Sequence, residues 1–154
     1  MQNLPSDDFR VSIPDDNFQS YLYNREGITV SEGTVAYGDI KGISKVSCHQ
    51  KHIWDLEGIQ YFTALTSLNC NGNQLTSLDV SKNNALTKLY CNNNQLTSLD
   101  VSQNTALTTL WGEYNQLTSL DVSQNSALTT LYCNNNQLTS LDLSQNTALM
   151  DLRE

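Results

Sequence analysis

Basic residues are few in this sequence: 8 lysines and arginines stand against 16 aspartates and glutamates in a chain of 154 residues. Binding to a phosphate backbone or to an anionic lipid surface depends on clustered basic side chains. The resulting net charge of −8 therefore argues against nucleic acid and membrane surfaces as partners. No apolar run approaches the roughly 18 residues that span a bilayer, so we also expect no membrane insertion.

Charged residues of either sign are scarce as well, at 16%, whereas hydrophobic residues make up 38% of the chain. Disordered chains combine low hydrophobicity with high net charge, so this composition predicts a folded protein, and its length fits one domain. Residues 1 to 5 form neither a signal peptide nor a lipidation motif, so no export signal is present in this chain.

Motifs of catalysis are missing too. The sequence has no glycine-rich phosphate loop, no Ser/His/Asp arrangement and no convergent pair of carboxylates. His49 and His52 are spaced H-x-x-H, but no acid or cysteine is placed to complete a metal site. We therefore predict no enzymatic activity, no catalytic residues, no bound metal and no cofactor.

Most of the sequence consists of internal repeats. A leucine recurs every 21 residues and opens a unit whose first half reads L-x-x-L-x-C-x-x-N-x-L and whose second half reads L-x-x-L-x-V-x-x-N. The leucines that open the units are Leu65, Leu86, Leu107, Leu128 and Leu149. An earlier, diverged unit begins at Ile43. The pattern resembles the leucine-rich repeat over residues 43–154.

The cysteine and the length of 21 residues together indicate one particular type of leucine-rich repeat. The units are similar to the cysteine-type repeats of the internalin family of bacterial surface proteins, and to repeat proteins of gut Bacteroidetes. The stretch from Ile13 to Phe18, followed by Tyr21 and Leu22, resembles the cap of those proteins. The resemblance implies an extracellular or bacterial cell-surface location, and a concave strand face that binds protein or glycan ligands.

The predicted fold is a leucine-rich-repeat solenoid, because one coil cannot bury its apolar positions alone and successive coils must stack. We expect a mainly β structure with stacked parallel strands, extended segments on both faces and an N-terminal helical cap. The cap is predicted over residues 1–42, with a short helix near 14–23 and an irregular or short-stranded connection over 24–42. The repeats then comprise a diverged first coil over 43–64, regular coils over 65–148 and a partial last coil over 149–154.

Residues at one repeat position should form columns along the stack. The four cysteines share one such position, with Gly112 in the intervening unit, and valine or leucine occupies the equivalent place in the second half. We therefore interpret the cysteines as small core residues rather than as disulfides or zinc ligands. Two asparagine columns are predicted to bind backbone groups at the corners of the coils: Asn73, Asn94, Asn115 and Asn136, and Asn83, Asn104, Asn125 and Asn146.

A column of acids is predicted on the opposite face. Stacked carboxylates repel one another by about 1 kcal/mol per neighbour even in water, so hydrogen bonds, cations or solvent must compensate. Solvated surface is the favoured interpretation, and weak calcium binding is the alternative. The four acids are Asp79, Asp100, Asp121 and Asp142, each followed two residues later by a serine.

The predicted ligand-binding site lies where the units differ from one another. Tyr90, Trp111 and Tyr132 share one solvent-facing strand position and are expected to form a row of exposed aromatic rings. Lys88, Glu113 and Tyr114 flank that row. Exposed aromatic side chains often anchor interfaces, and their flat faces also suit sugar rings. The alternative is that the rings only stack on one another and stabilise the sheet.

Together these features predict a non-catalytic recognition or adhesion module that binds a host or extracellular protein or glycan on the concave face. The alternative function is a rigid structural spacer, or an end-to-end assembly module, with no ligand of its own. Leucines of the last unit should flank an unpaired strand edge. We expect either a longer array or a homodimer formed through that coil, whose leucines include Leu141, Leu143, Leu149 and Leu152.

Overall fold

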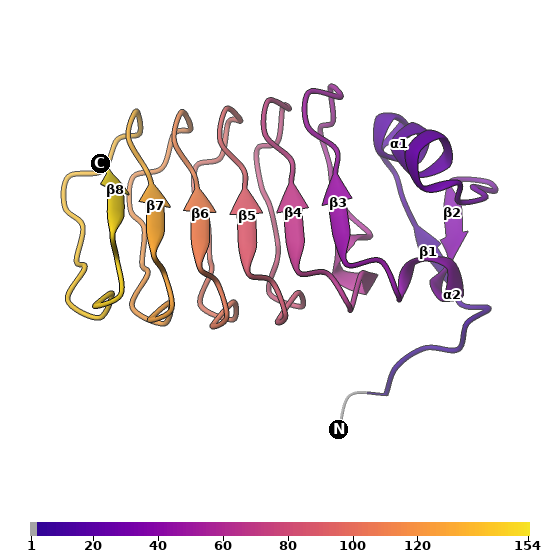
Figure 1. Cartoon of the computed structure of the whole chain (residues 1–154). Coiled ribbons are helices and arrows are strands. Elements are labelled where there is room, and N and C mark those ends of the chain that lie inside the picture. The colour runs from indigo at the N-terminus through magenta and orange to yellow at the C-terminus, as the bar shows by residue number, and fades with distance from the viewer. Residues whose placement is uncertain (1–2) are drawn as a thin grey trace.

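The computed structural model describes residues 3–154, which form two β-sheets, two α-helices and one short 3-10 helix. Figure 1 shows the coils stacked in a single row, with the helical cap at one end and the C-terminal strand at the other. Among the described residues, neither helix has the length and apolar character needed to cross a lipid bilayer.

The cap contains more regular structure than the sequence predicts. Strand β1 (Arg10–Ser12) pairs antiparallel with β2 (Thr34–Ala36), and α2 (Tyr37–Ile40) follows directly. Strand β2 fits the irregular or short-stranded connection that we expected over residues 24–42, whereas β1 and α2 were not expected. Their sequences are short and do not repeat, so no periodic pattern identifies them.

Helix α1 (Asp16–Glu26) corresponds to the helix predicted near 14–23, but it begins and ends later. Asp15 is the N-cap, and its side chain accepts hydrogen bonds from the first turn, so Pro14 precedes the helix instead of opening it. Gly27 ends the helix in the left-handed conformation, with φ of 67°, and its N–H donates to the carbonyl of Leu22.

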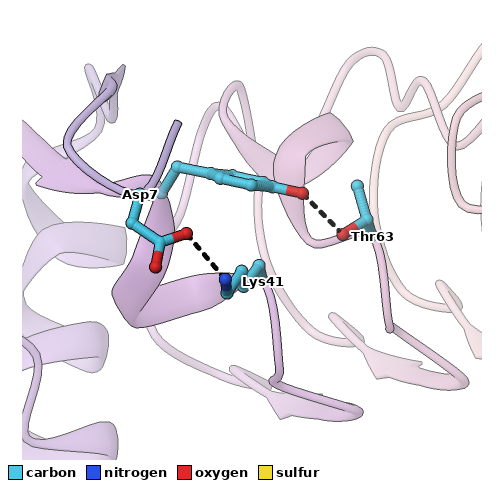
Figure 2. Close-up of polar contacts among 4 residues, drawn as sticks. Asp7, Lys41 and Thr63 are labelled. Carbon is cyan, nitrogen blue, oxygen red and sulfur yellow. Dashed lines mark hydrogen bonds and ion pairs between the residues drawn. The ribbon is translucent and has the colours of Figure 1, made fainter. Parts of the chain in front are cut away.

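The cap packs onto the first coil through both helices. Phe18 of α1 is fully buried, and its ring lies 6.0 Å from that of Phe62 in the first coil. In α2, the hydroxyl of Tyr37 lies 3.1 Å from that of Thr63 in the first coil, whereas the ion pair of Lys41 with Asp7, at 2.6 Å, lies within the cap (Figure 2). The cap is thereby joined to the solenoid by apolar packing as well as by polar contacts.

One six-stranded parallel sheet runs along the repeats. Each strand has three residues, and the middle residue of each points into the core. Equivalent residues pair in register from coil to coil, which confirms the leucine-rich-repeat solenoid. The strands are β3 (Lys45–Ser47), β4 (Ser67–Asn69), β5 (Lys88–Tyr90), β6 (Thr109–Trp111), β7 (Thr130–Tyr132) and β8 (Asp151–Arg153).

Strand pairing is confined to one side of the solenoid. The return half of each coil, for example residues 97–103, belongs to neither sheet, although extended segments were expected on both faces. Buried leucines and valines hold these segments together, among them Leu99 and Val101. The short 3-10 helix η1 (Ile59–Tyr61) occupies part of the return half in the diverged first coil.

The two asparagine columns replace strand pairing at the corners of the coils, as the sequence predicts. The side-chain oxygen of Asn94 accepts the N–H of Leu75 at 3.0 Å, and its amide nitrogen donates to the carbonyls of Cys70 and Cys91, each at 3.1 Å. In the second column, Asn104 donates to two carbonyl groups of the preceding coil at 3.0 and 2.9 Å. Both columns therefore satisfy buried backbone groups that no sheet pairs.

The cysteines are free and buried, as expected of small core residues. Burial raises the pKa of the Cys48 and Cys91 thiols to about 12 and that of Cys133 to about 11. The thiolate is the reactive form of cysteine, so these side chains are protonated and inert at neutral pH.

Gly112 interrupts the cysteine column and offers a stability test. Its φ lies outside the left-handed region, and a Cβ there would meet the Tyr132 carbonyl oxygen at 3.7 Å, an ordinary contact. We expect Gly112→Ala to raise the free energy of unfolding by about 1 kcal/mol, because alanine restricts the unfolded chain and adds core packing. Chemical denaturation followed by circular dichroism measures the change.

Gly58→Ala is the matched control, with the opposite expected sign. Gly58 has φ of 105°, and a Cβ there would lie 2.8 Å from the Ser12 carbonyl oxygen and still closer to the Ile13 side chain. This substitution should lower the free energy of unfolding by about 2 kcal/mol or more, because it introduces backbone strain and overpacking. Equal effects of the two substitutions would contradict the assigned packing.

Candidate functional site

The aromatic row lies on the outer face of the sheet. Tyr90, Trp111 and Tyr132 stand on β5, β6 and β7, where strand pairing places each ring beside the next. The Tyr90 and Trp111 rings meet edge to face, with centroids 4.7 Å apart, and the Trp111 and Tyr132 rings stack at 5.3 Å. Both arrangements are favourable for aromatic pairs.

The rings are less exposed than the sequence analysis predicts. Tyr90 and Trp111 are half-buried, and Tyr132 is only 9% exposed. Neighbouring strands are about 4.8 Å apart, so the Trp111 and Tyr132 rings cover each other's faces and Tyr90 packs edge to face with Trp111. The rings therefore stabilise the sheet, and only part of Tyr90 and Trp111 remains available for contact.

Two residues outside the predicted set complete the row. Asp151 and Arg153 lie on β8, in register with Thr130 and Tyr132. The Tyr132 hydroxyl donates to the Asp151 carboxylate at 2.6 Å, and the Arg153 guanidinium lies 4.2 Å from the centre of the Tyr132 ring. The hydrogen bond to Asp151 raises the pKa of Tyr132 above its ordinary value. The 21-residue period already places both residues in these columns.

One coil departs from its neighbours at four consecutive positions. Residues 111–114 read Trp-Gly-Glu-Tyr, where the flanking coils both have Tyr-Cys-Asn-Asn. Tyr114 is the most exposed aromatic side chain near the row, at 52%. The predicted site residues Trp111, Glu113 and Tyr114 therefore come from a single, specialised coil.

Tyr114 adopts an unusual backbone conformation. Its φ is 58°, in the left-handed region, where Asn93 and Asn135 occupy the same position of the flanking coils. Asparagine tolerates that region, whereas a bulky residue there is an outlier that costs about 1 kcal/mol or more. The exposed tyrosine is therefore retained at a cost in stability.

The charged members of the predicted site differ in environment. Lys88 is exposed on β5, whereas Glu113 is partly buried, and this burial raises the pKa of its carboxyl group. The Trp111 indole N–H is covered and has no hydrogen-bond partner within residues 3–154. An unpaired buried donor costs about 1–3 kcal/mol, so the same coil carries a second unfavourable feature.

The acid column is compensated by its own serines. The N–H and hydroxyl of Ser102 both donate to one carboxylate oxygen of Asp100, at 2.9 and 2.6 Å, and Asp79 makes the same contacts with Ser81. These hydrogen bonds lower the pKa of the column's carboxyl groups: Asp79, Asp100, Asp121 and Asp142. The arrangement fits the solvated-surface interpretation, because the carboxylates are held by local hydrogen bonds.

The two histidines lie on the surface of the first coil. Over residues 3–154, no group of three or more His, Cys, Asp or Glu side chains is arranged to hold a metal ion. His49 is exposed. The carbonyl of His52 accepts a hydrogen bond from the Asn17 side chain at 2.9 Å, which ties the first coil to α1.

The stacked in-register coils, the buried cysteine and asparagine columns and the helical cap define a leucine-rich-repeat solenoid of the cysteine-ladder type. No known family model matches the sequence. The chain is similar to internalin J of Listeria monocytogenes, with 41% identity over 75 residues. That match covers 49% of this chain and 8% of internalin J.

Solved structures show the same likeness in three dimensions. The functional domain of internalin J, which includes a cysteine ladder, matches 96% of this chain with a TM-score of 0.88 and 40% identity. A second internalin of L. monocytogenes, inlF, matches 94% with a TM-score of 0.83 and 26% identity. A leucine-rich-repeat protein of Leptospira interrogans matches 62%, with a TM-score of 0.58 and 30% identity. This chain spans 33% of the internalin J structure and 45% of the inlF structure.

Proposed function

We propose that this chain is a non-catalytic recognition module that binds an extracellular protein or glycan with its aromatic coil. The internalin-like leucine-rich-repeat fold supports a role in protein interaction or adhesion. The binding surface would consist of Lys88, the accessible parts of Tyr90 and Trp111, and the loop residues Glu113 and Tyr114. Tyr132 would support Trp111 by stacking beside it instead of contacting the ligand, since Tyr132 is 9% exposed.

The observation that carries this proposal is the backbone of Tyr114. Stacking explains why aromatic residues recur along the strands, but it does not explain a tyrosine with φ of 58° and a side chain that is 52% exposed. An asparagine at that position would relieve the strain, as it does in the flanking coils. Strained residues with exposed side chains are characteristic of binding sites, where function offsets the loss of stability.

The chemistry of the surface suits either ligand class. Aromatic edges and faces pack against apolar side chains or sugar rings, and Lys88 and Glu113 provide a charge of each sign for hydrogen bonding. The likeness to internalin J also supports an extracellular or bacterial cell-surface location. The whole protein would act by presenting this face, with no chemical step of its own.

Tyr114→Asn tests the proposal with two readouts of opposite sign. We expect the free energy of unfolding to rise by about 1 kcal/mol, because the left-handed strain is relieved. Binding should weaken by about tenfold or more, because an exposed aromatic anchor is lost. A glycan array and a panel of extracellular-matrix proteins identify the bound class, and surface plasmon resonance gives the affinity.

Gln50→Asn is the matched control, since Gln50 also has a positive φ, of 53°, but lies in the diverged first coil. That variant should gain stability and keep wild-type affinity. If Tyr114→Asn and Trp111→Ser both bind the panel as the wild type does, the aromatic coil is not the site. A wild type that binds nothing on either panel would favour the alternative, a rigid structural spacer or end-to-end assembly module with no ligand of its own.

A further inference from the structure

The return half of the first coil contains one residue more than that of the regular coils. Asn83 donates to the carbonyl of Ile59 at 3.0 Å, just as the next asparagine of that column donates to the carbonyl of Val80. Ile59 of the first coil is therefore the equivalent of Val80. Two residues, Glu57 and Gly58, separate Ile59 from the preceding leucine, whereas a single aspartate stands between leucine and valine in the regular coils.

A hollow of about 400 Å³ lies beside this insertion, between the first coil and the second. Its apolar lining consists of Leu56, Ile59 and Leu78. Leu78 is only partly buried, although the leucines at the same position of both neighbouring coils, Leu56 and Leu99, are buried. The volume is within the range of about 300–1,000 Å³ that is usual for ligand pockets, so an apolar group of a ligand can reach Leu78.

Acidic side chains surround the apolar part of the hollow. Three acids line it, against one basic residue, Lys82: Asp55, Glu57 and Asp79. One oxygen of Asp55 accepts the N–H of Glu57 at 2.8 Å. One oxygen of Asp79 accepts both the N–H and the hydroxyl of Ser81, which lowers the pKa of the Asp79 carboxyl group. Within residues 3–154, the other oxygen of each aspartate and both oxygens of Glu57 accept no hydrogen bond and form no ion pair, so they are available to a ligand.

We propose that this hollow binds an arginine side chain in a basic segment of a protein partner. Three carboxylates face a single lysine, so the hollow has a surplus of negative charge that a cation would balance. The arginine guanidinium has five N–H donors and no acceptor, and it can bind a carboxylate through two parallel hydrogen bonds. Its methylene stem packs on apolar side chains such as Leu78 while the charged head contacts the acids. The net charge of −8 on the whole chain also attracts a basic partner.

Other occupants fit this hollow less well. A neutral sugar would leave the surplus negative charge without a counter-ion. A metal ion needs a cage of ligands, and no group of three or more His, Cys, Asp or Glu side chains in residues 3–154 is arranged to hold one. The two coils that follow also carry an aspartate next to the leucine, but Leu99 and Leu120 are buried, so the acids there have no accessible leucine beside them.

Binding of a short arginine peptide to the full chain tests the proposal. The probe is the acetylated and amidated tripeptide Gly-Arg-Gly, and the reference peptide carries citrulline, which is neutral and nearly isosteric with arginine. Titration of the isotope-labelled chain followed by NMR should shift the amide signals of residues 55–60 and 77–82, with a dissociation constant of about 1 mM. The citrulline peptide should bind about tenfold more weakly, and added salt should weaken binding of the arginine peptide.

Two pairs of variants distinguish the hollow from the rest of the acidic face. Glu57→Gln removes one carboxylate from the hollow and should raise the dissociation constant about fivefold. Asp121→Asn changes the acid column two coils further along and should leave the dissociation constant as it is. Ser77→Phe should fill the hollow and abolish the localised shifts, whereas Ser98→Phe, at the same position of the next coil, should not. Both serines are exposed, so neither replacement disturbs the core.

Several results would overturn the proposal. These are the absence of localised shifts at about 10 mM arginine peptide, and equal binding of the citrulline peptide. Equal weakening by Glu57→Gln and Asp121→Asn would show general attraction to the acidic face instead of a site. Calcium that shifts the same signals when the arginine peptide does not would show a metal site. The hollow shares no lining residue with the aromatic coil, so each of these results is independent of the ligand that the aromatic coil binds.

Discussion

Replacing Asp15 with alanine is expected to lower the free energy of unfolding by about 3–4 kcal/mol. One carboxylate oxygen accepts the N–H groups of Asn17 and Phe18 at 2.8 and 3.0 Å, and so caps α1. The other accepts the N–H groups of Trp54 and Asp55 in the first coil at 2.7 and 3.1 Å. Asp15 is 9% exposed, so the alanine variant loses the cap and leaves backbone donors without a partner.

Chemical denaturation of Asp15→Ala, Asp15→Asn and Asp16→Ala measures this effect. Asparagine keeps one accepting oxygen, so its loss of stability should fall between those of the other two variants. Asp16 is an exposed acid in the first turn of α1, and its replacement should cost about 0.5 kcal/mol. If Asp15→Ala costs no more than Asp16→Ala, the carboxylate does not join the cap to the solenoid.

Asn94→Asp is expected to lower the free energy of unfolding by about 4 kcal/mol at neutral pH, a loss similar to that expected for Asp15→Ala. The substitution is almost isosteric, and the retained oxygen can still accept the N–H of Leu75. The second oxygen, however, would face the carbonyl oxygens of Cys70 and Cys91, to which the amide nitrogen now donates. A buried carboxylate would thus meet two acceptors in place of two partners.

The neighbouring substitution Asn93→Asp is the control. Asn93 is exposed and has φ of 56°, a conformation that aspartate also tolerates, so its replacement should change stability by about 0.5 kcal/mol or less. The Asn94→Asp deficit relative to wild type should shrink in mildly acidic buffer, because a protonated carboxyl group can donate one hydrogen bond. If Asn94→Asp and Asn93→Asp lower the free energy of unfolding by similar amounts at neutral pH, the asparagine column that contains Asn94 does not have the proposed structural role.

The repeating part of the molecule could be predicted in detail because every unit contains the same positions. Each unit therefore shows again which residue types a given position accepts. The 21-residue period places equivalent residues in adjacent coils, and in-register pairing then follows. Cysteine in the first half of a unit and valine or leucine in the second half occupy equivalent positions, which shows that this position is small and apolar. Asparagine recurring at a corner indicates a side chain that both donates and accepts, as Asn94 does.

The cap could not be predicted to the same extent, since nothing in it repeats. A helix was expected from Pro14 onward, but the position of its first turn depends on Asp15, whose carboxylate also holds residues 54 and 55. Strand β2 and helix α2 form because residues 34–40 pack against β1 and the first coil. Contacts between such distant segments leave no periodic signal in a single sequence.

The aromatic row was predicted in its position but not in its exposure. Register alone places Tyr90, Trp111 and Tyr132 on one face, and the structure confirms that placement. How much of each ring stays accessible depends on side-chain angles, which bring Trp111 flat against Tyr132 and Arg153 over the end of the row. The prominence of Tyr114 became clear only when its φ was known.

The sequence by itself determined the solenoid, the strand register, the buried cysteine and asparagine columns and the face that varies between coils. A periodic sequence specifies which side chains point inward, because every coil must bury the same positions against its neighbours. The tertiary structure decided which aromatic side chains remain exposed and how Asp15 joins the cap to the first coil. Those features depend on how particular side chains cover one another and on the hydrogen-bond direction of single residues, which periodicity does not encode.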